Sequence, residues 1–335
     1  MIVGSVSIVS ARKNMGLPEP STMKRILAGA IDMHVHVGPE IIPRAFDVLD
    51  LVEQMRELGM GGYVAKSNSQ CTAGETYVVN KLFHDVEGEW VAAFGAITLN
   101  YSVGGLNPVA INVAANLGTP FKYAQFKCVW FPTTSSIATM KFQQLEAGKT
   151  LGGTMPVGPR TAYTTSQKIF GGTGKGIEIV KPNGEIVPDV EAVIHAIAEN
   201  NLILATGHIS EDETFAVVDG AKSLGVKKII STHPRFPVER LIELANKGVI
   251  IEQTYTPPVF ASGAEGNLAA KIANISKIGA ERMIVTTDSG IRDGWWDNMA
   301  VAWKKIVETL LEGGITERQI ITMIKTNPKR LLDLE

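Results

Sequence analysis

The stretch IDMHVHVGP, residues 31–39, is the part of the sequence from which the fold can be worked out. Its apolar residues predict a buried β-strand that carries two histidines, His34 and His36, separated by one residue. Side chains alternate between the two faces of a strand, so both imidazoles project from the same face. Two imidazoles inside an apolar strand are costly unless a divalent cation or another partner organises them. The alternative is that they are two ordinary histidines, one of them satisfied within the core.

Length and composition restrict the class of protein. A chain of 335 residues with 45% hydrophobic and 20% charged residues is globular and can bury a large core. The formal net charge of −2 gives no reason to expect nucleic acid or an anionic membrane as a partner. Two cysteines, Cys71 and Cys128, cannot build a disulfide framework and fit a reducing compartment. The apolar residues 1–10 precede Arg12 and Lys13, which is the wrong order for a signal peptide, so we expect a cytoplasmic protein.

Apolar runs of strand length alternate with helical patterns along most of the chain. After a lead-in over residues 1–28, eight such runs follow, and their nearly continuous apolar character is typical of parallel strands covered on both faces. The runs are residues 31–39, 62–66, 91–99, 122–130, 202–208, 228–233, 249–253 and 283–288. Eight strand–helix units predict a (β/α)8 TIM barrel of the α/β class over residues 29–335. A doubly wound open sheet is the alternative fold.

The alternation is interrupted after the fourth run. Residues 131–176 contain nine Thr and eight Gly without a sustained apolar period, and a connection of this length is usually functional. Residues 177–180 and 185–187 then flank a Lys-Pro-Asn-Gly turn, which predicts a small hairpin. We therefore expect residues 131–187 to be an insertion in the barrel, consisting of a lid or subunit contact and a hairpin. We also expect a homo-oligomer.

Histidine and aspartate residues gather at the predicted strand ends. The first strand ends with His34 and His36, the fifth with His208, the sixth with His233 and the eighth with Asp288. In a barrel of this type the C-terminal ends of the strands form one rim, where active sites lie. Four of the six histidines therefore share this rim with an aspartate, a joint pattern that chance explains poorly.

Two lysines lie on the predicted strands. In the fourth strand, Lys127 and Val129 share one face, while Phe126 and Cys128 share the other, and an outward apolar face would turn Lys127 into the barrel. A lysine carboxylated by CO2 becomes an anionic carbamate that can bridge two metal ions, and we favour this role for Lys127. The alternative is a lysine that binds an anionic substrate or pairs with an acid. Lys66, at the end of the second strand, is the rival for either role, and we expect it to bind substrate.

The order of these residues resembles that of the amidohydrolase superfamily of metal-dependent hydrolases. The resemblance covers residues 29–333 and is carried by His34-x-His36, Lys127, His208, His233 and Asp288 on strands one, four, five, six and eight. The segment NPKRLL, residues 327–332, is also similar to the terminal helix of compact members. The sequence departs from the pattern of this superfamily in two ways. The residues around Lys127 match no single subfamily, and the chain leaves no room for the β-sandwich domain that many members carry. We therefore expect a compact member.

The resemblance implies hydrolysis by a metal-activated hydroxide. It implies His34, His36 and Asp288 as ligands of a first divalent ion, zinc or manganese, and His208 and His233 as ligands of a second, with Lys127 as the bridge. With one ion, His208 joins the first three ligands, and His233 hydrogen-bonds the water or the substrate. Asp288 also takes the proton from the attacking water and passes it to the leaving group.

The implied substrate is a small molecule with an amide or cyclic amide C–N bond. Hydrolysis of a lactone or phosphoester and non-oxidative decarboxylation use the same ligands and stay open. Arg235 and Arg292, on loops of the rim, could clamp a carboxylate or be ordinary surface residues. Asp32 shares the inward face of His34 and could support the ligands from behind. A barrel that binds metal for structural reasons alone would be a different class of protein. Asp288 argues against this class, because such a barrel would not need a base.

Overall fold

Eight parallel strands follow one another in sequence order around a nearly closed barrel. The computed structural model describes residues 20–83, 91–119, 122–141, 175–255, 268–292 and 298–334. The strands are β1 (Ile31–His36), β2 (Gly62–Lys66), β3 (Ala92–Thr98), β4 (Phe126–Trp130), β5 (Ile203–Ala205), β6 (Lys228–Ser231), β7 (Ile250–Thr254) and β8 (Met283–Thr286). A parallel bridge between Val35 and Ser289 joins β1 to the chain just after β8. The predicted (β/α)8 barrel is thus confirmed, and the open-sheet alternative is wrong.

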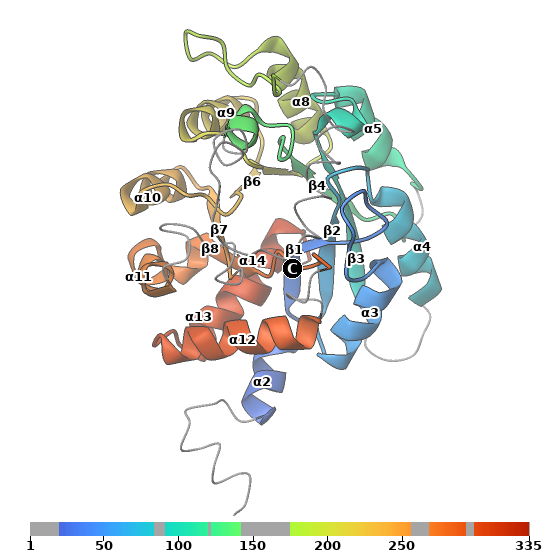
Figure 1. Cartoon of the computed structure of the whole chain (residues 1–335), viewed down its shortest axis with the longest axis vertical. Coiled ribbons are helices and arrows are strands. Elements are labelled where there is room, and N and C mark those ends of the chain that lie inside the picture. The colour runs from blue at the N-terminus through green and yellow to red at the C-terminus, as the bar shows by residue number, and fades with distance from the viewer. Residues whose placement is uncertain are drawn as a thin grey trace, which may run out of the picture.

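Helices surround the strands (Figure 1). They are α2 (Pro20–Leu27), α3 (Val48–Glu57), α4 (Ala73–Phe83), α5 (Pro108–Asn116), α8 (Pro188–Glu199), α9 (Glu211–Ser223), α10 (Val238–Asn246), α11 (Leu268–Ile278), α12 (Met299–Glu312), α13 (Glu317–Ile321) and α14 (Asn327–Leu331). Two short 3-10 helices, η1 (Tyr101–Val103) and η3 (Ala280–Arg282), and a π-helix, η4 (Thr322–Thr326), complete the set. Local sequence sets several of their starts. In α9, for example, the Ser210 and Glu213 side chains cap each other's backbone N–H groups.

The inside of the barrel is filled by a second apolar cluster, separate from the one beneath the helices. Its members on the strands are Ile31, Met33, Val64, Ala92, Phe94, Ala96, Cys128, Trp130, Ile203, Ala205, Ile230 and Ile284. Leu331 and Leu332, at the end of α14, belong to the same cluster, and α14 packs against β1 at the N-terminal end of the barrel. Polar side chains are therefore left to the opposite end, the C-terminal rim.

The connection between β4 and α8 is described only at its two ends. Residues 142–174, on which most of the predicted lid or subunit contact falls, lie outside the described residues. In the predicted hairpin, Val180 and Ile186 form a single antiparallel bridge, and the Lys181 N–H donates to the Glu185 carbonyl at 2.7 Å. The hairpin therefore consists of a turn closed by one β-bridge, without two extended strands.

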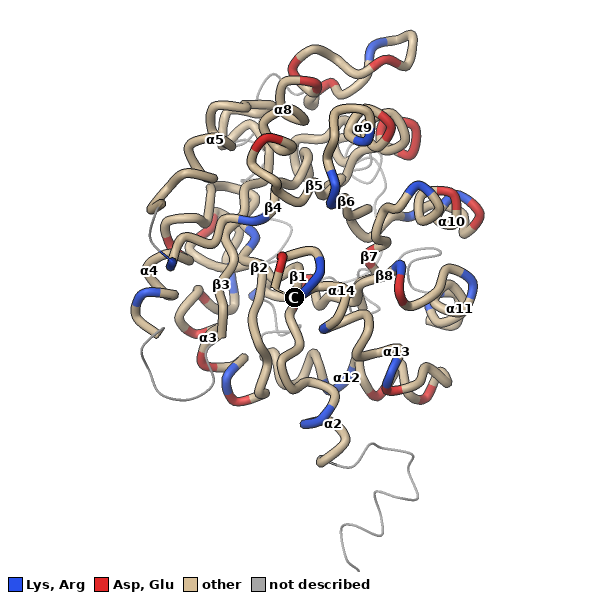
Figure 2. Tube along the Cα trace, turned by 180° about the vertical axis from the view of Figure 1, so that it is seen from behind, with Lys and Arg blue, Asp and Glu red and all other residues tan. Residues whose placement is uncertain are grey.

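Acidic and basic residues are interspersed along the outer helices (Figure 2). Many form ion pairs between neighbouring elements, such as Arg25 with Glu317 at 2.9 Å and Lys247 with Asp219 at 2.6 Å. This mixture agrees with the small net charge of the chain. Among the helices that the structure describes, none combines the length and the apolar character needed to cross a membrane.

Candidate metal centre

Three of the predicted residues converge where β1 and β8 meet at the C-terminal rim. The Oδ1 atom of Asp288 lies 3.0 Å from Nε2 of His34 and 3.2 Å from Nε2 of His36. The two histidines end β1, and the Asp288 N–H donates to the His34 carbonyl at 3.0 Å, which fixes the aspartate beside the strand. Asp288 has a positive φ of 50°, a conformation that is unfavourable outside glycine and concentrates at functional sites. We call these three side chains the donor group.

His208 and His233 form a pair beside the donor group. Their Nε2 atoms are 3.3 Å apart, and Nε2 of His233 lies 3.9 Å from Oδ2 of Asp288. Gly207 allows this placement, because a Cβ atom there would come within 2.2 Å of the Phe131 carbonyl oxygen. The structure therefore brings all four predicted histidines and the aspartate to one place.

The donor group is deeply buried on one side and open on the other. The side chains of His34 and His36 are 0% and 9% exposed, whereas those of His233 and Asp288 are 16% and 20% exposed. Small molecules can therefore reach Asp288 and His233, while the two histidines of β1 are shielded. A structural metal site would be closed on all sides, so this arrangement is typical of a catalytic site.

The protonation states favour metal binding by most of these groups. Burial lowers the pKa of His36, of His208 and of His233, so these imidazoles are neutral at physiological pH. Burial alone would raise the pKa of Asp288, but the charge of His34 and the hydrogen bonds from His34 and His36 hold it well below its ordinary value. Burial and Lys66 lower the pKa of His34, yet the carboxylates raise it to about 9, so a bound metal would displace a proton from this ring.

Glu252, in the middle of β7, supports the donor group and was not among the predicted residues. Its Oε1 atom lies 2.8 Å from Nδ1 of His34 and accepts from the Thr286 hydroxyl at 2.8 Å, while Oε2 accepts from the His233 N–H at 3.1 Å. Burial raises the pKa of Glu252, but His34 outweighs this effect and lowers it below its ordinary value. A charged residue that directly follows two isoleucines in a predicted strand was the signal in the sequence that could have identified it.

Asp32 supports the backbone around the site rather than the histidine rings. Its Oδ1 atom accepts from the His34 N–H at 3.1 Å, and its Oδ2 atom accepts from the Thr287 hydroxyl at 2.7 Å. Burial raises the pKa of Asp32 to about 7, although these hydrogen bonds counteract it. Asp32 thus ties the end of β1 to the turn that carries Asp288.

Lys66 is the lysine that the structure brings to the site. It is only 1% exposed, and its Nζ atom lies 2.9 Å from Nε2 of His34 and 5.3 Å from the centre of the Trp130 ring. Burial lowers the pKa of Lys66, while Asp288 and Glu252 raise it. Its position fits the predicted substrate contact.

Lys127 lies elsewhere, and its predicted orientation is wrong. Between β3 and β4 the register advances by one residue on β3 and by two on β4, which leaves Lys127 in a bulge. As a result Cys128 faces the barrel interior and Val129 the outer core, the reverse of the predicted faces. Burial lowers the pKa of Lys127, and the charges that affect it are those of Asp333, which follows α14, and Lys228, which begins β6. Lys127 is therefore at the N-terminal end of the barrel and does not bridge metal ions at the donor group.

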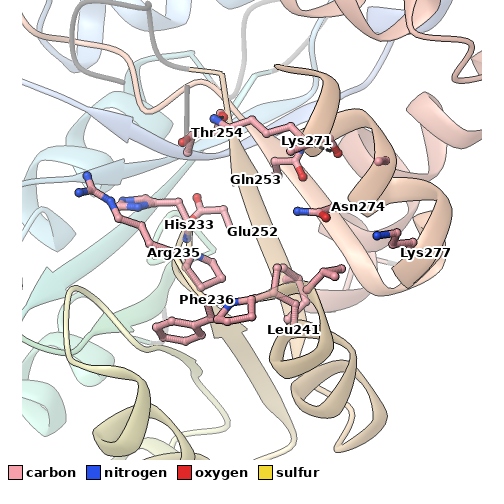
Figure 3. Close-up of a pocket in the computed structure, with 16 residues that line it drawn as sticks. His233, Arg235, Phe236, Leu241, Glu252, Gln253, Thr254, Lys271, Asn274 and Lys277 are labelled. Carbon is pink, nitrogen blue, oxygen red and sulfur yellow. Dashed lines mark hydrogen bonds between the residues drawn. The ribbon is translucent and has the colours of Figure 1, made fainter. Parts of the chain in front are cut away.

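The two predicted arginines are exposed on loops of the rim. Arg235 lines a cavity of about 310 Å³ between α10 and α11, together with His233 and Glu252 (Figure 3). Arg292 follows Asp288, and its N–H donates to the Pro43 carbonyl at 3.3 Å. The structure therefore keeps both arginines near the rim but shows neither within the donor group.

The donor group fits a divalent transition metal. One ligand atom from each of His34, His36 and Asp288 can be chosen so that all three lie within 4.8 Å of one another. Two imidazole nitrogens and a carboxylate oxygen suit zinc better than calcium or magnesium, which prefer ligands that are all oxygen. Among the described residues, this is the one cluster of its kind.

Solved structures of amidohydrolase-superfamily barrels resemble the chain. An amidohydrolase from Pseudomonas aeruginosa is 14% identical with a TM-score of 0.58, and the match covers 94% of this chain and 98% of that protein. A PTE-like lactonase mutant from Deinococcus radiodurans is 14% identical with a TM-score of 0.52, over 91% and 95% of the two chains. A TatD homologue from Escherichia coli is 11% identical with a TM-score of 0.52, over 92% and 100%. These likenesses confirm the predicted resemblance at the level of the fold.

Sequence comparison adds the family. No curated protein matches the sequence significantly. One family model matches residues 29–252, from just before β1 to Glu252, and it therefore spans the strands that carry four histidines of the site. The chain belongs to the family described as "Family of unknown function (DUF6282)".

Proposed function

We propose that the protein is a metal-dependent hydrolase of a small molecule. The observation that carries this proposal is the convergence of His34, His36 and Asp288 at the C-terminal rim, with Asp288 accessible from outside. The rim is the place where barrels of this fold carry their active sites. The amidohydrolase and the lactonase that share the fold are named as hydrolases, which supports the same class of reaction.

The ligands of the metal would be His34, His36 and Asp288, with His208 and His233 beside them. A bound zinc or manganese ion would polarise the substrate carbonyl and lower the pKa of an attacking water to about 7. With Lys127 at the other end of the barrel, the proposal requires only one ion. His233 then acts as a hydrogen-bond partner of the water or the substrate rather than as part of a bridged second site.

The protein side chains have distinct tasks in this proposal. Asp288 presents Oδ1 to the two histidines of β1, whereas Oδ2 faces His233 at 3.9 Å and can accept the proton of the attacking water. The same oxygen then returns the proton to the leaving group. Lys66 would reach an oxygen of the substrate from the buried side of the donor group, where its amine lies 2.9 Å from Nε2 of His34. Arg235 and Arg292 would bind an anionic part of the substrate at the rim.

Amides and cyclic amides are the substrates that we propose. The accessible Asp288 supports this choice, because a nitrogen leaving group needs a proton and Asp288 can supply it. Lactones need the same attack on a carbonyl and belong in the same screen. A metal-binding structural barrel is disfavoured, since such a site has no reason to leave its aspartate 20% exposed.

A substrate screen with and without metal tests the proposal. The purified full chain is stripped with a chelator, reloaded with zinc or manganese, and incubated with panels of amides, cyclic amides, lactones and phosphoesters. We expect turnover of at least one carbonyl substrate that depends on the added metal and disappears in His34→Ala. His195→Ala is the matched control, because His195 is exposed on α8. Metal-independent turnover, or turnover that survives His34→Ala, would contradict the proposal.

A further inference from the structure

The inner side of β7 carries a buried carboxylate, that of Glu252. Glu252 is 3% exposed, and on either side of it Ile251 joins the outer core and Gln253 donates to the Tyr255 hydroxyl and the Lys271 carbonyl of α11. A carboxylate buried in this way costs several kcal/mol unless its partners compensate for the lost hydration. The hydrogen bonds of Glu252 must therefore compensate for the cost of burying its charge.

Each oxygen of Glu252 contacts a different histidine. Oε1 lies 2.8 Å from Nδ1 of His34, on β1, and Oε2 accepts from the backbone N–H of His233, after β6, at 3.1 Å. The Thr286 hydroxyl, on β8, donates to Oε1 at 2.8 Å and keeps the carboxylate in place. One side chain thus links three strands whose ends carry the donor group and its neighbours.

We propose that Glu252 is a positioning residue that selects the metal-facing nitrogen of His34 and fixes the turn that carries His233. This inference rests on the proposed metal-dependent function. A carboxylate has only acceptors, so Nδ1 of His34 must keep its hydrogen, and Nε2 is the nitrogen left to a metal. Nε2 is also the atom that faces Asp288 at 3.0 Å.

The second half of the inference follows from the backbone of His233. This residue has a positive φ of 23°, which is unfavourable for a side chain other than glycine, and such a conformation persists when surrounding contacts impose it. The hydrogen bond from its N–H to Glu252 is such a contact. His233 and Glu252 also line the cavity between α10 and α11, so packing from that side is incomplete (Figure 3). The hydrogen bond is therefore one of the contacts that hold the pair on the side of the cavity.

Glu252→Gln tests the inference without changing the size of the side chain. The amide NH2 group must face either Nδ1 of His34 or the His233 N–H. In the first case Nδ1 can no longer donate to residue 252 and the tautomer of His34 is no longer fixed, and in the second case the N–H of His233 loses its acceptor. We expect the affinity for zinc, measured on the full chain by competition with a chromophoric chelator, to fall about 10- to 100-fold, as for other partners of metal-bound histidines. In the zinc-loaded, 15N-labelled protein the Nδ1–H signal of His34 should shift or disappear. Glu308→Gln, at another buried glutamate on α12, should change neither quantity.

The outcomes separate this inference from the function on which it rests. Wild-type protein that binds neither zinc nor manganese refutes the proposed function. Wild-type protein that binds zinc, with Glu252→Gln equal to it in affinity and in the His34 signal, leaves that function standing and overturns the role of Glu252. Thr286→Val is a milder second variant for the case in which Glu252→Gln does not fold. It removes one hydrogen bond to Oε1, so zinc affinity should fall several-fold, and an unchanged affinity would also overturn the inference.

Discussion

Replacing Asp288 by asparagine removes one chemical property of the site and changes little of its shape. The aspartate uses Oδ1 to face the Nε2 atoms of His34 and His36, at 3.0 and 3.2 Å, and leaves Oδ2 for the proton of the water. In Asp288→Asn the amide oxygen can take the place of Oδ1, which puts the NH2 group where Oδ2 was. That group cannot accept a proton, so the fold should survive while the proton transfer is lost.

The expected loss can be estimated from the role of the group. A positioned general acid–base group contributes on the order of 10²- to 10⁴-fold to the rate, which corresponds to about 2.7 to 5.5 kcal/mol of activation free energy. Loss of the negative charge also weakens metal binding, so kcat must be compared at saturating metal. The assay is the steady-state rate on the best substrate of the screen, with metal content measured on the same sample.

Asp333→Asn is the matched control for this experiment. Asp333 pairs with Lys228 at 2.7 Å at the N-terminal end of the barrel, so its replacement should leave kcat unchanged. The reasoning is refuted if folded, metal-loaded Asp288→Asn keeps a rate within about threefold of the wild type. In that case the base would be another residue, or the reaction would not be a hydrolysis.

Two further predictions follow from buried charges. Lys66→Met should keep its metal and raise KM for the best substrate at least tenfold, whereas Lys127→Met should change neither KM nor metal content; unchanged kinetics in Lys66→Met would remove Lys66 from the substrate contacts. Burial raises the pKa of Asp32 from its ordinary value of 3.8 to about 7, so its stabilising contribution is complete at acid pH and lost as the pH rises through 7. The loss amounts to roughly 4 kcal/mol at most. Between pH 5 and 8, the free energy of unfolding measured in urea should therefore fall less in Asp32→Asn than in the wild type. If the free energy of unfolding of the two proteins depended on pH in the same way, this role of Asp32 would be contradicted.

The strand pattern and the rim residues could be predicted because both depend on local sequence. The eight strands are apolar runs separated by helical patterns, and a histidine or aspartate at the end of such a run lies at the rim once the barrel is formed. The register of β1 against β2 is irregular between Asp32 and Val35, yet His34 and His36 both present Nε2 to Asp288, as the prediction that they share a face requires. The position of His208, His233 and Asp288 at the same rim could be predicted from the assumption that parallel strands end at one edge.

The remaining site residues depend on contacts that no single strand reveals. Lys127 was misplaced because a bulge in β4 reverses the alternation between Phe126 and Cys128, and strict alternation cannot locate a bulge. Glu252 was missed because its partners lie on β1, β6 and β8 and approach it only in the closed barrel. The sequence names Lys66 as the rival of Lys127, and the structure adds that its amine lies 2.9 Å from His34.

The metal content of the purified protein tests the central claim most directly. Elemental analysis of the full chain, expressed in medium that contains zinc and manganese, should find close to one equivalent of a divalent transition metal in the wild type and in His195→Ala. The double variant His34→Ala, His36→Ala should retain the fold, as judged by circular dichroism, and lose that equivalent. Equal metal content in the folded double variant and the wild type would contradict the metal centre described above.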